Sequence, residues 1–211
     1  MDGSPELKRK LRSAVLWVAG LNLAYFGVEF TMALKLGSVS LLADSIDLFE
    51  DVAINILIFL ALGWSLRARA VTGKVLAYLI CIPALFAAGE AIRKVINPDA
   101  PDPLLLALTA GGAGVINLVC ALILVPFRKS RSSMARVAYL SARNDVIVNI
   151  LIILIGFITA LTRSGWPDII LGVIIIAINI FAAKEVWDVA HAEHLEARSL
   201  GRELEEDELP N

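Results

Sequence analysis

The feature that most constrains this chain is a series of six apolar stretches separated by short breaks. A helix that crosses a lipid bilayer needs about 20 mostly apolar residues, and each stretch is long enough. The stretches cover roughly residues 13–34, 39–65, 74–96, 104–126, 137–162 and 167–187. Their length and their richness in Leu, Ile, Ala and Val favour helices over barrel strands. The sequence therefore predicts an all-α integral membrane protein with six transmembrane helices.

The composition argues against the other broad classes of protein. Hydrophobic residues make up 58% of the 211 residues and charged residues 19%, whereas soluble domains are about 45–50% apolar and about 25% charged. With 14 Gly, 8 Pro and 2 Cys, the chain is neither collagen-like nor disulfide-stapled. A net charge of −2 argues against nucleic acid as a partner. The lipid bilayer is the first partner that the sequence predicts.

The basic residues follow an alternating pattern that predicts the orientation in the membrane. Of the 19 Lys and Arg residues, 14 lie in or at the edges of the two terminal regions and the breaks after the second and fourth apolar stretches. Because Lys and Arg concentrate in cytoplasmic loops, both termini are predicted to be cytoplasmic, in a multi-pass protein of the inner or plasma membrane. The predicted organisation is a cytoplasmic tail at 1–12, a six-helix transmembrane domain at 13–190 and a short acidic cytoplasmic tail at 191–211.

Acidic residues gather inside the second apolar stretch. A carboxylate at bilayer depth costs about 2.5–3.5 kcal/mol to insert, yet this stretch holds Asp44, Asp47, Glu50 and Asp51. Asp47 and Asp51 are four residues apart and share one helix face, and Asn55 extends their stripe by another turn. Two carboxylates this close repel each other unless a cation lies between them. The pair therefore predicts a cation site.

The fifth apolar stretch carries a matching polar stripe. Ser141, Asp145 and Asn149 follow each other at helical spacing, with Asn144 beside Asp145. If this stripe faces the first, three aspartates supply oxygen ligands for a divalent cation, and Ser141, Asn144, Asn149 or water could complete the shell. Oxygen ligands suit zinc, manganese and iron(II) alike. Because carboxylates bind metal in their ionised form, such a site exchanges metal for protons, as an antiporter requires.

Other interpretations of these residues stay open at this point. The aspartate pair of the second stretch could be a helix-end cluster capped by basic residues. Asp145 could form a buried ion pair with Arg143, and Ser141 could hydrogen-bond to a carbonyl of its own helix. Asp44 could be structural, line the access path or serve as an additional ligand.

The acidic tail adds one more candidate metal site. His191 and His194 lie on adjacent turns and could capture a metal in the cytosol, or they could belong to a solvated amphipathic tail. The chain has no His-Glu-x-x-His motif and no nucleophile elbow, and no histidine lies within the six stretches. We therefore expect a protein that is not an enzyme.

Taken together, these motifs resemble the cation diffusion facilitator family of divalent-metal/proton antiporters. Residues 37–51 read GSVSLLADSIDLFED, which is similar to the family's Gly-Ser entry to the second helix and to its ligand pair four residues apart. Weaker matches are Gly73-Lys74, Glu90-Ala91-Ile92, Asn117, Asn144-Asp145-Val146 and Trp166-Pro167-Asp168. The resemblance covers residues 12 to about 190.

The resemblance implies a fold and a ligand set. Each protomer of a homodimer, formed through the transmembrane helices, has its metal site between the second and fifth helices. The family's four ligand positions fall on Asp47, Asp51, Ser141 and Asp145, and Ser141 stands where the family usually has His or Asp. The family's C-terminal cytoplasmic metal-sensing domain has no counterpart in this sequence, which therefore resembles a short form.

The resemblance also implies an activity. The chain would export a divalent transition metal, with Zn²⁺ as the first candidate and Cd²⁺, Fe²⁺, Mn²⁺ or Co²⁺ as further ones. Protons would be the coupling ion, and transport would proceed by alternating access. The alternative is a non-transporting accessory or regulatory membrane protein that binds metal or pairs with a full-length transporter.

Overall fold

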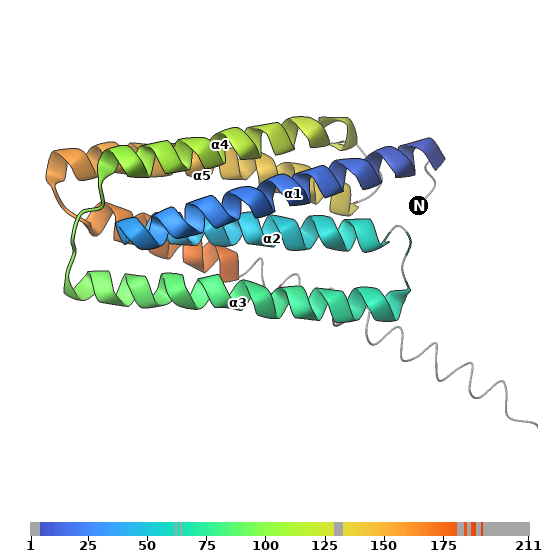
Figure 1. Cartoon of the computed structure of the whole chain (residues 1–211), viewed down its shortest axis with the longest axis horizontal. Coiled ribbons are helices and arrows are strands. Elements are labelled where there is room, and N and C mark those ends of the chain that lie inside the picture. Colours follow the sequence, from blue (N-terminus) through green and yellow to red (C-terminus); the bar gives the residue numbers. More distant parts are fainter. Residues whose placement is uncertain are drawn as a thin grey trace, which may run out of the picture.

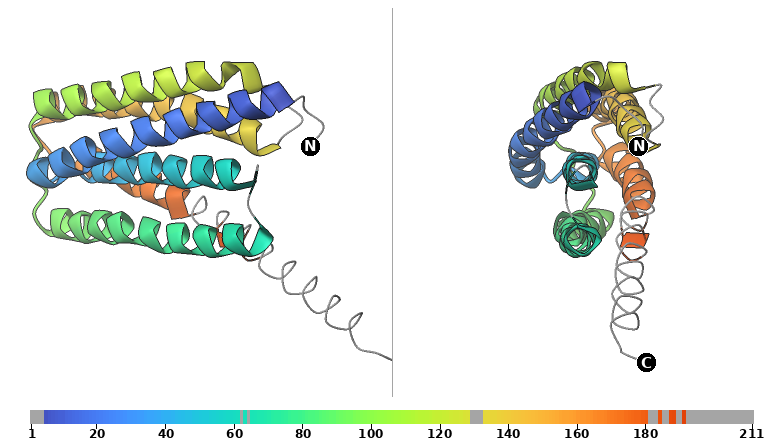
Figure 2. Two further views of the ribbon diagram at one scale, coloured as in Figure 1. Left: turned by 45° about the vertical axis from the view of Figure 1, so that its right-hand side comes forward. Right: turned by 90° about the vertical axis from the view of Figure 1, so that its right-hand side faces the viewer.

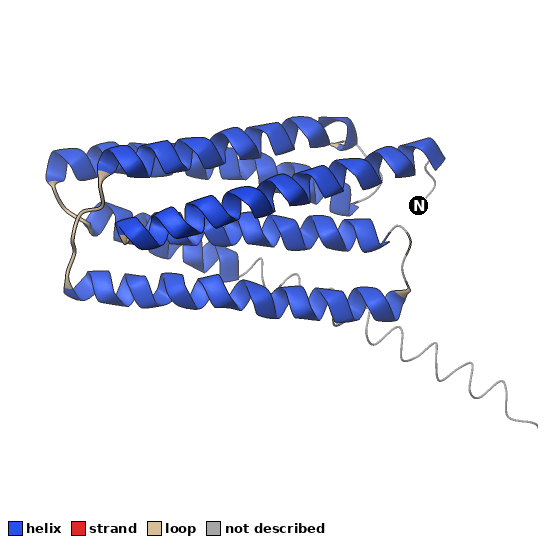
Figure 3. Ribbon diagram, viewed as in Figure 1, coloured by secondary structure: helices blue, strands red, loops and turns tan. Residues whose placement is uncertain are grey.

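The structure is a computed structural model that describes residues 5–61, 63, 65–128 and 133–180, together with positions 184, 187, 188 and 191. In these residues it consists of helices and connecting loops, with no strand (Figure 3). The helices are α1 (Pro5–Leu36), α2 (Val39–Ala61), α3 (Leu66–Ile96), α4 (Pro103–Leu124) followed by the 3₁₀ turn η1 (Val125–Phe127), α5 (Ser133–Thr162) and a further helix, Trp166–Ile180. The prediction of an all-α protein is confirmed.

Consecutive helices run antiparallel along the long axis of the molecule (Figure 1). The connections 97–102 and 163–165 lie together at one end, and the N-terminus lies at the other. Helix α2 packs against α1, α3 and α5, and the end-on view of Figure 2 shows α3 on the side of α2 away from α4. The acidic helix therefore occupies the interior of the bundle.

The distribution of side chains fits a lipid environment. Large apolar side chains face outward, among them Trp17, Leu85 and Leu161, which are 67%, 73% and 86% exposed. Within the described residues, three helices are long and apolar enough to cross a membrane, Glu6–Leu36, Pro103–Phe127 and Ala138–Thr162, and Trp166–Ile180 is a shorter apolar helix. Large apolar side chains on the exterior, with charged and amide side chains buried inside, are the reverse of what a soluble domain shows. The count of six spans stays a prediction.

A tight reversal joins α1 to α2 and sets the position of the acidic helix. Gly37 has a φ of 57°, a left-handed conformation that glycine adopts without strain. Its amide donates to Leu34 O at 3.3 Å, and the amide of Ser38 donates to Ala33 O at 3.0 Å, the two bonds of a Schellman C-cap. Because the turn is so short, the first residues of α2 begin beside the last turn of α1.

Candidate metal site

The acidic residues of α2 lie in the interior of the bundle. Asp44, Glu50 and Asp51 are buried, and Asp47 is half-buried. In the part of the chain that the structure describes, the ion pairs are Lys10–Glu6, Arg93–Glu90 and Lys94–Asp168, so none joins a basic side chain to this set. The alternative of a helix-end cluster capped by basic residues therefore finds no support.

Asp51 is contacted by side chains from two other helices, and a third helix supports one of these contacts. Asn22 of α1 donates its amide to Asp51 Oδ2 at 3.0 Å. Asn22 is in turn fixed by Cys120 of α4, whose thiol donates to Asn22 Oδ1 at 3.4 Å. Ser141 of α5 lies within hydrogen-bonding reach of the Asp51 carboxylate. These contacts hold the carboxylate in one orientation at the α2–α5 interface.

Asp145 of α5 approaches the same interface from the opposite side. It is 8% exposed and lies within electrostatic range of Asp51, Asp44 and Glu50. Asp47 lies within electrostatic range of Asp145 across the interface. The two stripes that the sequence predicted therefore face each other, on α2 and on α5.

The alternative of a buried ion pair between Asp145 and Arg143 finds no support among the described side chains. Arg143 is exposed, and its Nη2 donates to Asn144 Oδ1 at 3.1 Å. Asn144 is exposed as well and lies with Arg143 on the outer face of α5. Asp145 is thus left without a cationic neighbour in its own helix turn.

The remaining candidate ligands are placed as follows. Asn55 and Asn149 are each 1% exposed. Asn55 Nδ2 donates to Asp51 O at 2.8 Å and Asn149 Nδ2 to Asp145 O at 2.9 Å, so each amide caps the carbonyl one turn earlier. Both keep an Oδ1 without a hydrogen-bond partner.

For the tail, the structure describes His191, which is exposed, whereas His194 lies outside the described residues. Across the described residues as a whole, no group of three or more His, Cys, Asp or Glu side chains lies close enough together to hold a metal ion. The α2–α5 stripes face each other but do not form a closed coordination shell in this conformation.

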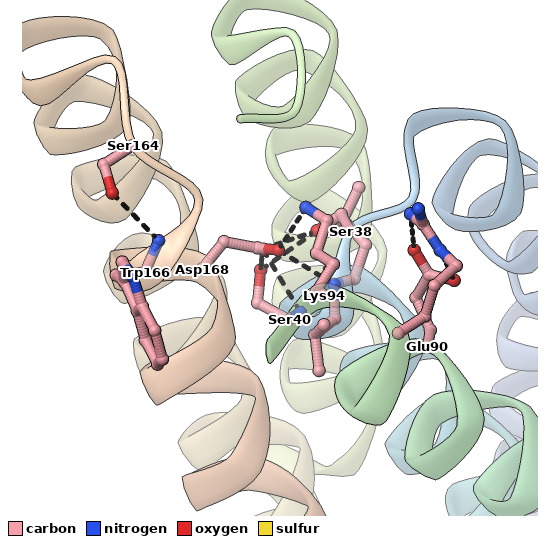
Figure 4. Close-up of polar contacts among 10 residues, drawn as sticks. Ser38, Ser40, Glu90, Lys94, Ser164, Trp166 and Asp168 are labelled. Atoms are coloured by element: carbon pink, nitrogen blue, oxygen red, sulfur yellow. Dashed lines mark hydrogen bonds and ion pairs between the residues drawn. The ribbon is translucent and has the colours of Figure 1, made fainter. Parts of the chain in front are cut away.

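A second buried polar cluster lies at the end of the bundle opposite the N-terminus (Figure 4). At its centre is the completely buried Asp168. Its carboxylate accepts hydrogen bonds from Ser38 Oγ (2.7 Å), Val39 N (2.9 Å), Ser40 N (3.2 Å) and Ser40 Oγ (2.6 Å). Lys94 Nζ, on a side chain that is 1% exposed, lies 3.2 Å from the same carboxylate. The cluster satisfies the free N–H groups at the start of α2 and ties α2, α3 and the last described helix together.

Sequence reasoning assigned no role to this cluster. Lys94 had no assignment, and Asp168 had only a place in a motif. The signal that could have found the pair is that both charges lie within predicted helices of an apolar chain, where each needs a partner.

These features define a class: a helical membrane protein with an apolar exterior and an acidic interior. A family profile described as the cation efflux transmembrane domain matches residues 15–191. The chain therefore belongs to the cation efflux, or cation diffusion facilitator, family, and the resemblance found in the sequence is confirmed. A comparison with curated proteins finds no match. Membership in this family supports metal cation transport at the level of the family.

Proposed function

We propose that the protein exports a divalent transition-metal ion, with Zn²⁺ as the first candidate, in exchange for protons. Cd²⁺, Fe²⁺, Mn²⁺ and Co²⁺ are further candidates, because carboxylate oxygens can bind each of them. In this proposal the protein works as a homodimer of six-span protomers in the inner or plasma membrane. The basic residues place both termini in the cytoplasm.

One observation carries the proposal. Asp47 and Asp51 on α2 face Asp145 on α5, and none of the ion pairs among the described side chains neutralises them. Three carboxylates in a membrane interior need positive charge, which either a metal ion or protons supply. A site that accepts either one in turn is the chemical basis of metal/proton exchange.

In this proposal some residues bind the metal directly and others orient a ligand. Asp47, Asp51 and Asp145 bind the metal, and Ser141 or water fills the fourth position of a tetrahedral shell. Asn22 and Cys120 act through Asp51, because their hydrogen bonds orient its carboxylate.

Relative movement of α2 and α5 exposes the site first to the cytoplasm and then to the outside, where protons compete for the carboxylates. Each net charge moved across the membrane is worth about 2.3 kcal/mol per 100 mV, so the metal-to-proton ratio decides how the potential helps.

A second candidate function rests on Ser141. A neutral hydroxyl is a weaker metal ligand than imidazole or carboxylate, which favours an accessory protein that binds metal or pairs with a full-length transporter without transporting ions itself. The two candidates differ in one observable: only the transporter moves metal when it is the sole protein in a vesicle.

Zn²⁺ uptake into vesicles that contain only this protein separates these candidates. The test variant is Asp51→Asn, which keeps an oxygen to accept the Asn22 hydrogen bond and removes only the charge. The matched control is Glu6→Gln on the exposed first turn of α1. We expect uptake by the parent and by Glu6→Gln, and a rate at least about tenfold lower for Asp51→Asn, because even residues that only orient ligands change metal affinity 10–100-fold. No uptake by the parent would favour the accessory protein, and full uptake by Asp51→Asn would refute the site.

A further inference from the structure

A buried pair of carboxylates from two helices lies beside the proposed transport site. Glu29 of α1 and Asp44 of α2 are both completely buried, and their side chains contact each other. Neither oxygen of Glu29 has a hydrogen-bond partner, and neither does Asp44 Oδ2. Buried polar atoms without partners are rare in folded proteins and call for an explanation. Two carboxylates buried together have to be neutralised, either by protons or by a cation bound between them.

The hydrogen-bond donors around this pair are engaged elsewhere. Tyr25, one helical turn before Glu29, donates its hydroxyl to Thr109 O at 2.8 Å. Asn149 donates its amide at 2.9 Å to a carbonyl of its own helix, and reaches Asp44 Oδ1 only at 3.5 Å. Among the described residues, no basic side chain forms an ion pair with either carboxylate.

What remains around the pair is a set of acceptors. Two oxygens of Glu29, one of Asp44 and Oδ1 of Asn149 are buried and unpartnered. They come from α1, α2 and α5, which meet at α2. Carboxylate and amide oxygens contributed by several helices are suitable ligands for a hard or borderline cation.

We propose that Glu29, Asp44 and Asn149 hold a second divalent transition-metal ion, separate from the one bound by the proposed transport site. The identity of the ion rests on the proposed function. Two carboxylates balance its charge, the Asn149 amide oxygen adds a third ligand, and water completes the shell. Since Glu29 belongs to α1, occupancy of this second site couples α1 to the two helices that carry the transport site.

Counting bound ions tests the second site. Zn²⁺ bound per protomer is measured by equilibrium dialysis of the purified full-length protein in detergent. The variants are Glu29→Gln, Asp51→Asn and the double variant, and Glu6→Gln on α1 is the matched control. All are made in a chain that carries His191→Ala and His194→Ala, so that the tail pair does not contribute. Asp44→Asn repeats the test from α2, in case Glu29→Gln does not fold.

The expected counts are two ions for the parent and for Glu6→Gln, one for Glu29→Gln, Asp44→Asn and Asp51→Asn, and none for the double variant. If the parent binds one ion, Glu29→Gln also binds one and Asp51→Asn binds none, the second site is refuted and the transport site stands. A pair that holds protons alone gives that result. If Asp51→Asn still binds two ions and Glu29→Gln binds one, the transport site is refuted and the second site stands. A parent that binds no Zn²⁺ overturns both.

Discussion

Removing Asp168 should destabilise the protein more than removing Lys94, although the two form one ion pair. Both side chains are buried, at 0% and 1% exposure, with 3.2 Å between Lys94 Nζ and Asp168 Oδ2. The two substitutions differ in the environment that they leave around the remaining partner. Without Lys94, the Asp168 carboxylate keeps its four hydrogen bonds from the start of α2. Without Asp168, the ammonium of Lys94 is buried with no acceptor, and the first turn of α2 loses its cap.

The contacts set the size of the two effects. Lys94→Met removes one hydrogen bond to a charged group, which costs about 1.5–3 kcal/mol. Asp168→Leu leaves an uncompensated buried charge, which costs about 3–5 kcal/mol. For a chain of this length, 1 kcal/mol shifts the melting temperature by about 2–4 °C. The melting temperature should therefore fall by about 3–12 °C for Lys94→Met and by about 6–20 °C for Asp168→Leu.

A double variant gives the sharpest form of this prediction. Adding Lys94→Met to Asp168→Leu removes the buried ammonium, so the second substitution should raise the melting temperature of the first. Thermal unfolding in detergent, followed by tryptophan fluorescence and by circular dichroism, measures all four proteins. If the double variant melts at or below Asp168→Leu, the stranded charge is not the source of the loss and the reasoning is refuted.

Three further substitutions test the geometry of the site and the bundle. Asn22→Ala removes the amide that orients Asp51 and should weaken Zn²⁺ binding about 10–100-fold. Calorimetric titration of the folded variant measures this change, and unchanged affinity would mean that the hydrogen bond has no part in binding. Ser141→His should strengthen Zn²⁺ binding relative to Mn²⁺ in competition dialysis, because imidazole favours zinc, and an unchanged preference would place residue 141 outside the ligand shell. Asp102→Ala removes the side chain that accepts the Leu105 amide at 2.9 Å at the start of α4 and should cost about 1 kcal/mol of stability, visible as a drop of a few degrees in thermal unfolding; no drop would show that solvent replaces the cap.

The helices were predictable because their signal is local. Hydropathy predicts a helix wherever an apolar stretch is long enough, and every predicted stretch corresponds to a helix. The first helix nevertheless begins at Pro5 rather than near residue 13, and the third at Leu66 rather than near 74. The apolar stretches end where basic residues begin. The helical backbone hydrogen bonds, by contrast, continue through these basic residues.

The acidic stripes were predictable for the same local reason, and their partners were not. The spacing of Asp47 and Asp51 places them on one helix face without any knowledge of the fold. That Asn22 binds Asp51, 29 positions away in the sequence, follows only from how α1 packs on α2. The contact of Asp168 with Ser38 spans 130 positions and depends on the tertiary arrangement in the same way.

The central claim is that the carboxylates of α2 and α5 exchange a divalent metal for protons. The most direct measurement follows Zn²⁺ entry and proton exit at the same time in vesicles that contain only this protein, with metal- and pH-sensitive dyes enclosed. The account predicts that added Zn²⁺ drives protons out of the vesicles in a fixed ratio to the metal that enters, and that Asp145→Asn abolishes both fluxes together. Zn²⁺ entry without any proton movement, or undiminished coupled flux in Asp145→Asn, would contradict it.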